Sequence, residues 1–135
     1  MATQLEGRAA ELLSGKNYAI ITTLAEDGSP HSAVVWIGVE DGKATINSAV
    51  GRKWPTQLDK DPRVAICVYD QQNPYEYVEV RGRVGAGDTS EEADRHIDGL
   101  AKKYLDADTY PFRQPGEQRI KYVVDAEHVR HQKQG

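Results

Sequence analysis

Very short turns between uncharged segments rich in β-branched residues restrict the fold of this chain more than any other feature. Residues 17–24 and 30–39 are two such segments, and only a turn at 26–29 (EDGS) lies between them. Asp41-Gly42 forms a second tight turn before a third segment, 44–48. Connections this short join antiparallel neighbours, because a parallel pair needs a crossover of a dozen or more residues. The pattern predicts an antiparallel meander and excludes a fold built from β-α-β units.

Three further segments complete a predicted six-stranded antiparallel sheet. They are residues 63–69, 75–87 and 119–126, and Gly82 within the second indicates a bend or a bulge. Strands that are mostly neighbours in sequence predict a small split β-barrel, a mainly β fold with flanking helices. A six-stranded barrel is filled by its own side chains, so a ligand must bind outside it or between subunits.

Three helices are predicted around this sheet. They are expected at residues 3–15, 54–58 and 89–105. Two capping boxes mark helix starts, Thr3 with Glu6 and Thr89 with Glu92. The last helix carries an apolar stripe at helical spacing, formed by Ala93, Ile97, Leu100, Ala101 and Tyr104.

Composition excludes several classes of function. The chain has 135 residues, 39% apolar and 28% charged, with a formal net charge of −4, so binding to nucleic acid through bulk charge is not expected. No apolar run approaches the ~20 residues that span a bilayer, and no export signal is visible. A lone cysteine, Cys67, is typical of a reducing compartment. We expect one cytoplasmic domain over residues 1–135, with a polar C-terminal tail at 128–135.

The stretch 47–63 (NSAVGRKWPTQLDKDPR) is the most informative about function. Arg52 and Lys53 are adjacent, follow Gly51, and precede a predicted helix N-terminus. Backbone N–H groups at such a position favour an anion, and the two cations add charge-assisted hydrogen bonds. The residues alone leave two interpretations open: a monophosphate-binding site, or two solvated cations in a surface loop.

The order of these motifs resembles the pyridoxamine 5'-phosphate oxidase-like split barrels, a superfamily that binds flavins and deazaflavins. A strand, GRK, a short amphipathic helix, DPRV and a second strand follow one another, and VEVRGRV and KYLDADTY also fit. GRKWPTQLDKDPRV with the short C-terminus is most similar to the actinobacterial branch that uses the deazaflavin coenzyme F420. The Arg-Pro-bearing C-terminal segment of the true oxidases is not apparent, which argues against vitamin B6 chemistry. FMN is the alternative cofactor.

The resemblance implies cofactor-binding roles at four places in the chain. The strand at 32–36 is expected along the tricyclic ring, Asn47 and Ser48 near the ring and ribityl chain, and Arg52 with Lys53 at the phosphate. The implied cofactor-binding residues are Ser32, Ala33, Val34, Val35, Trp36, Asn47, Ser48, Arg52, Lys53, Trp54, Pro55, Tyr75 and Tyr77. Most of them also have a structural interpretation, as packing residues on strands or as a loop cap.

A homodimer is implied by the same resemblance. Because the barrel interior is full, the ring would lie in a groove between two barrels. Tyr75 and Tyr77 would then come from the second subunit to cover the ring, although tyrosines on a strand are also common packing residues. The partners expected are a small-molecule substrate and a second copy of the chain, with neither nucleic acid nor membrane.

The remaining polar residues suggest little chemistry. His31 is interpreted as an exposed histidine at a strand end, with proton donation as the alternative. His128 and His131 lack a third ligand nearby in sequence, so no metal site is predicted. Cys67 lies inside an apolar strand and is expected to be a buried small side chain. No catalytic general acid can be named.

The function that follows is hydride transfer. We expect an F420-binding oxidoreductase that passes hydride from the reduced deazaflavin to an electron-poor conjugated small molecule, with the cofactor carrying the chemistry. The alternatives are an FMN-dependent oxidase or reductase of the same fold, and a non-catalytic F420-binding protein. The sequence does not choose the acceptor, because pocket shape decides it.

Overall fold

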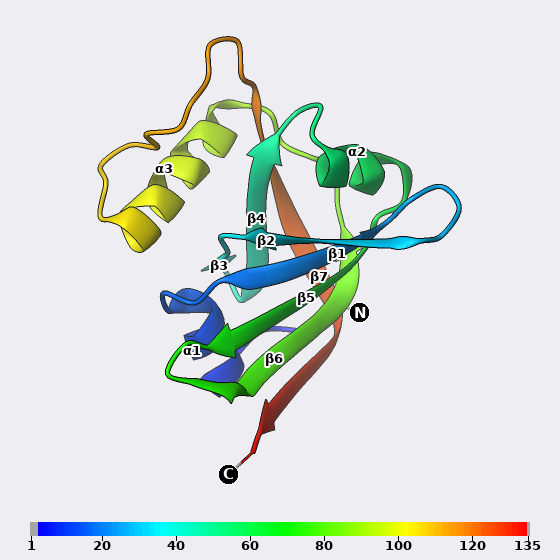
Figure 1. Ribbon diagram of the computed structural model, residues 1–135, viewed down its shortest axis with the longest axis vertical. Coiled ribbons are helices and arrows are strands. Elements are labelled where there is room, and N and C mark those ends of the chain that lie inside the picture. The colour runs from blue at the N-terminus through cyan, green and yellow to red at the C-terminus, as the bar shows by residue number, and fades with distance from the viewer. Residues whose placement is uncertain (1–2, 135) are drawn as a thin grey trace.

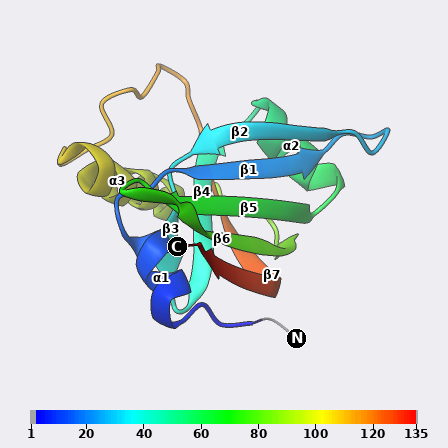
Figure 2. The ribbon, with the colours of Figure 1, turned by 60° about the horizontal axis from the view of Figure 1, so that its bottom comes forward.

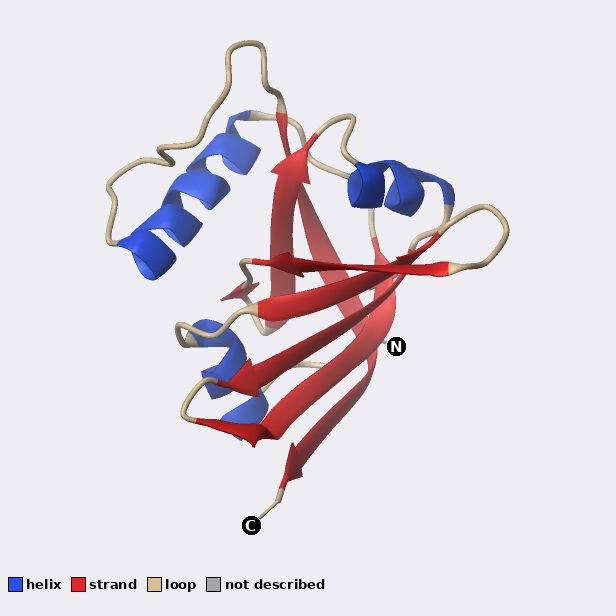
Figure 3. Ribbon diagram, in the orientation of Figure 1, coloured by secondary structure: helices blue, strands red, loops and turns tan. Residues whose placement is uncertain are grey.

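The computed structural model describes residues 3–134, which form seven strands with three helices around them (Figures 1 and 3). The helices are α1 (Gly7–Ser14), α2 (Lys53–Lys60) and α3 (Glu91–Leu105). The strands are β1 (Ala19–Leu24), β2 (Pro30–Val35), β3 (Gly38–Glu40), β4 (Lys43–Ala49), β5 (Arg63–Asp70), β6 (Asn73–Val84) and β7 (Arg119–Lys133).

The strands form one antiparallel sheet in the order β2-β1-β5-β6-β7-β4-β3. Figure 2 shows β2, β1, β5, β6 and β7 side by side in one layer. The edge strands β2 and β3 are consecutive in sequence, with only Trp36 and Ile37 between them. This link reaches at most about 11 Å, whereas the edges of a flat seven-stranded sheet would lie about 29 Å apart. The sheet therefore curls until its edges approach each other, which confirms the predicted split barrel.

The predicted strand at 30–39 is divided into β2 and β3, so the sheet has seven strands among the described residues rather than six. The predicted meander is also wrong, because β2 pairs with β1 and β3 pairs with β4, at opposite edges. Ile37 explains the break. Its N–H donates to the Tyr104 hydroxyl at 3.2 Å and its carbonyl accepts from Lys103 Nζ at 2.5 Å, so its backbone binds α3 instead of a strand.

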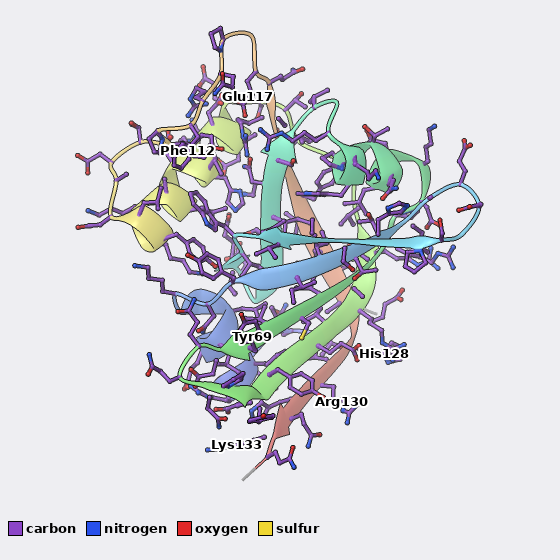
Figure 4. All side chains as sticks on the ribbon, in the orientation of Figure 1. Tyr69, Phe112, Glu117, His128, Arg130 and Lys133 are labelled. Atoms are coloured by element: carbon purple, nitrogen blue, oxygen red, sulfur yellow. The ribbon has the colours of Figure 1, made fainter. Side chains whose placement is uncertain are left out.

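The predicted C-terminal tail is a strand as far as Lys133, and the prediction that β7 ends at 126 is wrong. The segment pairs with β6, where Val78 lies opposite His131. Figure 4 shows His128, Arg130 and Lys133 spaced along it. His131 Nε2 lies 2.8 Å from Glu76 Oε2. Polar residues therefore continue the sheet because β6 supplies a partner; Gly135 lies outside the described residues.

Both predicted capping boxes are wrong, although the helices are present. Glu6 is the N-cap of α1 and no side chain caps it. At α3 the N-cap is Ser90, whose hydroxyl accepts from the Glu92 N–H at 3.2 Å. The apolar stripe of α3 is confirmed, since all of its predicted members are buried.

Side chains fill the barrel interior. Ile21, Ile46 and Val68 are completely buried, and Tyr122 is 1% exposed while its hydroxyl donates to Asp59 Oδ1 at 2.9 Å. The inner face is thus a packed core that leaves ligands to the outer surfaces. None of the helices found in residues 3–134 has the length and apolar character required to cross a bilayer.

Gly82 lies at the predicted irregularity, where the register between β6 and β7 shifts after Arg81. A Cβ atom added at Gly82 would overlap the backbone oxygen of Asp125 on β7. Backbone cannot move aside as a flexible side chain can, so the two strands approach this closely only because residue 82 lacks a side chain.

Gly82→Ala is therefore expected to lower the free energy of unfolding by about 1–3 kcal/mol, the usual cost of overpacking. Gly85→Ala is the matched control, because a Cβ there meets nothing within 4 Å, and its effect should stay within about 0.5 kcal/mol. Urea denaturation of both variants gives the comparison. Equal stability of the two would show that β6 and β7 are not held together this tightly.

Candidate functional site

A groove of about 280 Å³ lies where β2, the end of β4, α3 and the segment before β7 meet. Many of the predicted site residues come together in its lining: Val34, Val35, Trp36, Asn47, Ser48, Arg52 and Trp54. A larger hollow of about 900 Å³ lies between the β1–β2 turn and α2, but its lining is mostly polar and contains no ring of Phe, Tyr or Trp. The smaller groove is the candidate site.

Aromatic rings form one wall of the groove. Trp36 stacks on Tyr104 with ring centroids 5.3 Å apart and planes 10° apart, and Tyr104 stacks on Tyr18 at 5.4 Å. Tyr110 meets Trp36 edge-on at 6.0 Å, and Phe112 meets Tyr110 at 5.8 Å. Such a wall presents flat apolar surface against which a planar ring can pack.

Two side chains of α3 hold this wall in place. The Tyr104 hydroxyl donates to the Asn17 carbonyl at 2.5 Å, and burial raises the pKa of Tyr104 to about 12. Lys103 Nζ donates to the carbonyls of Leu13 and Ile37 at 2.8 and 2.5 Å, and burial lowers the pKa of Lys103 to about 8. Trp36 is therefore fixed between β2 and α3 by bonds to backbone on both sides.

The other end of the groove is cationic. Arg52 is the N-cap of α2, its side chain is 54% exposed, and its Nη2 lies 3.9 Å from Glu117 Oε1. No side chain caps the N-terminus of α2, so its first N–H groups are available to an anion. Lys53 lies beside the groove rather than in it, with Nζ 3.5 Å from His31 Nδ1.

A buried polar network supports the groove from behind. Arg119 is 3% exposed, donates from Nε to Asn47 Oδ1 at 3.0 Å, and lies over the Tyr110 ring at 4.8 Å. A second nitrogen of Arg119 donates to Glu117. Burial opposes ionisation of Glu117, but hydrogen bonds from the Gln114 N–H and from Arg119 outweigh it and lower the pKa of this carboxyl.

Asn47 connects the groove to α3. Its Nδ2 lies 2.9 Å from the Ala93 carbonyl and 3.0 Å from His96 Nδ1. His96 Nε2 in turn lies 2.9 Å from Thr45 Oγ1, and burial together with the charge of Lys121 lowers the pKa of His96 to about 4. The imidazole is therefore neutral at ordinary pH.

Several predicted site residues lie outside the groove of this protomer. Ser32 directs its hydroxyl at Thr22 Oγ1, 3.0 Å away, and Ala33 packs on the core. The Pro55 carbonyl accepts from the Tyr122 hydroxyl at 3.2 Å. Tyr75 and Tyr77 lie on β6, do not line the groove, and stay candidates for contact with a second subunit.

Sequence reasoning missed the segment between α3 and β7. It supplies Tyr110 and Phe112, and it leads into Arg119 at the start of β7. Figure 4 shows Phe112 and Glu117 on this segment. The local signal was present as YPFRQPGEQR, which combines aromatic and charged residues, but its position beside β4 depends on the β4–β7 pairing of Ala49 with Arg119.

The remaining candidates lie elsewhere. Cys67 is only half-buried, on the outer face of β5, so the prediction of a buried side chain is wrong; burial and then Glu79 raise the pKa of its thiol. Within residues 3–134, no group of three or more His, Cys, Asp or Glu side chains is arranged to hold a metal ion.

The family is shown by sequence. The family model described as pyridoxamine 5'-phosphate oxidase matches residues 5–133. The chain belongs to this family. No curated protein matches this sequence. The resemblance inferred from the GRK motif is thus confirmed at the level of the pyridoxamine 5'-phosphate oxidase family.

Solved structures agree on the fold. A protein named F420 reductase has a TM-score of 0.80 at 23% identity, over 93% of this chain and 98% of that chain. A conserved hypothetical protein of Mycobacterium tuberculosis has a TM-score of 0.76 at 19% identity, over 98% and 88%. General stress protein 26 of Bacillus anthracis has a TM-score of 0.67 at 16% identity, over 90% and 88%. At these identities the likeness shows the split barrel of the pyridoxamine 5'-phosphate oxidase family.

Because His96 has a pKa of about 4 in the fold and about 6.5 when exposed, unfolding takes up a proton between these values. Its contribution to stability is thus present above pH 6.5 and is lost as the pH falls toward 4, with a slope of at most about 1.4 kcal/mol per pH unit. In urea unfolding, the stability of the wild type should therefore fall relative to that of His96→Asn, which does not titrate at this position, as the pH drops from 6.5 toward 4. A pH-independent difference would contradict a buried neutral imidazole.

Proposed function

We propose that this chain is an oxidoreductase that binds coenzyme F420 and reduces an electron-poor conjugated small molecule. One observation carries the proposal: a single groove joins an aromatic wall to Arg52 at an uncapped helix N-terminus. A deazaflavin has the matching shape, with a tricyclic ring at one end of a ribityl chain and a phosphate at the other. Family membership and the likeness to a protein named F420 reductase support the same reading.

The residues present fit such a cofactor. Arg52 and the first N–H groups of α2 would take the phosphate, and Lys53 would add a second cation from outside the groove. Ser48 and Asn47 would face the ribityl chain and ring edge, and Trp36 would pack beside the ring. When bound, the reduced deazaflavin supplies a hydride.

The protein's own part is binding, orientation and exclusion of water. Trp36 is held by α3, so the ring would meet a wall that does not need to rearrange. The charge of Arg119 is balanced by Glu117, and its guanidinium lies over the Tyr110 ring. These partners would stabilise the buried cation without water in the groove. No His, Asp, Glu, Cys or Lys is among the described residues that line the groove, where Tyr18 and Tyr110 carry the phenol hydroxyls, and we propose that the proton that accompanies the hydride comes from solvent.

A second copy of the chain would complete the site. Three apolar side chains at the groove are exposed: Val34 by 71%, Phe112 by 56% and Tyr18 by 37%. Exposed apolar area beside a shallow groove is typical of a protein interface. Tyr75, which is 67% exposed at the start of β6, and Tyr77 would reach the ring from the partner. We therefore propose a homodimer with two equivalent sites.

Side-by-side fluorescence titration of the purified protein with F420 and FMN tests the cofactor. We expect micromolar or tighter binding of F420 and weaker binding of FMN, followed by oxidation of reduced F420 when a conjugated acceptor is added. Tight FMN binding instead would place the chain among the FMN-dependent enzymes of this fold. F420 binding with no turnover would indicate a non-catalytic carrier.

Arg52→Ala with Lys53→Ala should weaken cofactor binding by about 150- to 25,000-fold, because two charge-assisted hydrogen bonds of ~1.5–3 kcal/mol each are lost. Arg95→Ala with Lys102→Ala is the matched control: it removes the same net charge from the exposed side of α3. Unchanged affinity in the first double variant would contradict the phosphate assignment.

Sedimentation at micromolar concentration should give a dimer, since the interface would cover the exposed apolar residues. Val34→Glu, which places a charge at the centre of that surface, should shift the protein toward monomer and weaken cofactor binding together. A wild-type monomer would contradict a site shared between subunits.

A further inference from the structure

The orientation of the Asn47 amide is fixed by two partners that leave no chemical choice. Arg119 Nε carries a proton and only donates, so the atom 3.0 Å from it must be the amide oxygen. The Ala93 carbonyl only accepts, so the atom 2.9 Å from it must be the amide nitrogen. The second amide proton then points to His96 Nδ1, 3.0 Å away. That nitrogen must carry a lone pair.

His96 is consequently a neutral imidazole with its proton on Nε2, where it donates to Thr45 Oγ1 at 2.9 Å. His96 is 8% exposed, and Asn47 and Thr45 are the hydrogen-bond partners of its two ring nitrogens. The charged groups that face it are Glu40 of β3, Glu92 of α3, and Lys121 and Arg119 of β7. Lys121 Nζ is bound by Glu40 at 2.9 Å and by Glu92 at 3.0 Å, so this charge cluster is paired internally.

We propose that His96 is a positioning residue for the groove. Its Nδ1 accepts a hydrogen bond from the Asn47 amide, which keeps the Asn47 oxygen on Arg119. The guanidinium that lines the groove is thereby fixed. The inference rests on the proposed function, in which ligands bind in this groove. His96 itself does not line the groove, so it acts only through Asn47 and Arg119.

Protonation of His96 would disturb Arg119 through Asn47. A proton on His96 Nδ1 would face the Asn47 N–H, donor against donor, and the amide would have to turn. Turning would aim the amide nitrogen at Arg119 Nε, which is also a donor. Arg119 would then keep only Glu117 and the Tyr110 ring as partners, and a buried guanidinium N–H would lose its acceptor.

Two substitutions at one position separate this role from a merely structural one. In His96→Asn the side-chain oxygen lies near the former Nδ1 and still accepts from Asn47. In His96→Gln the longer amide reaches the former Nε2 position near Thr45, so one Asn47 amide proton loses its acceptor while the Ala93 carbonyl keeps the other. Titration with F420 and with FMN should show at least tenfold weaker binding by His96→Gln and less than threefold weaker binding by His96→Asn. Leu12→Val, a core change in α1, is the control for lost stability and should bind as the wild type does.

A second measurement needs no ligand. The Arg119 Nε–H, observed by ¹⁵N NMR, should exchange with solvent slowly in the wild type and in His96→Asn, and at least tenfold faster in His96→Gln. Asn47→Asp should raise the pH at which His96 titrates by one unit or more, because a carboxylate accepts from a protonated Nδ1.

The outcomes are distinct. Equal cofactor affinity and equal Arg119 exchange in wild type and His96→Gln would overturn the positioning role. Failure of the wild type to bind either cofactor would overturn the proposed function, and Arg119 exchange would still decide whether His96 holds the guanidinium.

Discussion

Two residues, Trp36 and Ile37, join the opposite edges of a seven-stranded sheet, and their short reach compels the sheet to curl. The link has no strand partner of its own. It is stabilised by α3, where Tyr104 and Lys103 bind the Ile37 backbone on both its N–H and its carbonyl. The closed barrel, the position of α3 and the location of the groove all depend on this crossing.

The groove lies beside this crossing, between β2, the end of β4 and α3. Trp36 reaches it from the end of β2, and Asn47 and Ser48 reach it from β4. The interior is packed with aliphatic side chains, so a planar ligand has no room inside. Val34 is exposed beside this groove, which agrees with the second subunit that we propose.

Polar residues behind the groove are buried without being left unsatisfied. Asn47, Arg119 and His96 form hydrogen bonds with one another, with the Ala93 carbonyl, and with the side chains of Glu117 and Thr45. In a buried, low-dielectric environment such a network specifies one arrangement, because a turned amide or an added proton would place donor against donor or acceptor against acceptor. The groove therefore combines an exposed cation, Arg52, with a buried one, Arg119.

The sequence predicted the parts of the fold and site that depend on local pattern. Alternating and β-branched segments located the strands, the apolar stripe located α3, and the GRK motif placed Arg52 before a helix. It failed where a partner far along the chain decided the outcome. Polar residues after Ala126 became a strand because β6 lies beside them.

By itself, then, the sequence determined the position of most strands and helices and the cationic motif, because each of these is encoded within a few consecutive residues, and the family, because its pattern extends over residues 5–133. Tertiary structure alone decided that Trp36 and Ile37 bridge two sheet edges, that Tyr110 and Phe112 complete an aromatic wall, and that Asn47 joins His96 to Arg119. The contacts of Trp36 with Tyr110 and of Asn47 with His96 and Arg119 join residues 49 to 74 positions apart. No local propensity specifies them; they follow from closing the barrel around its core.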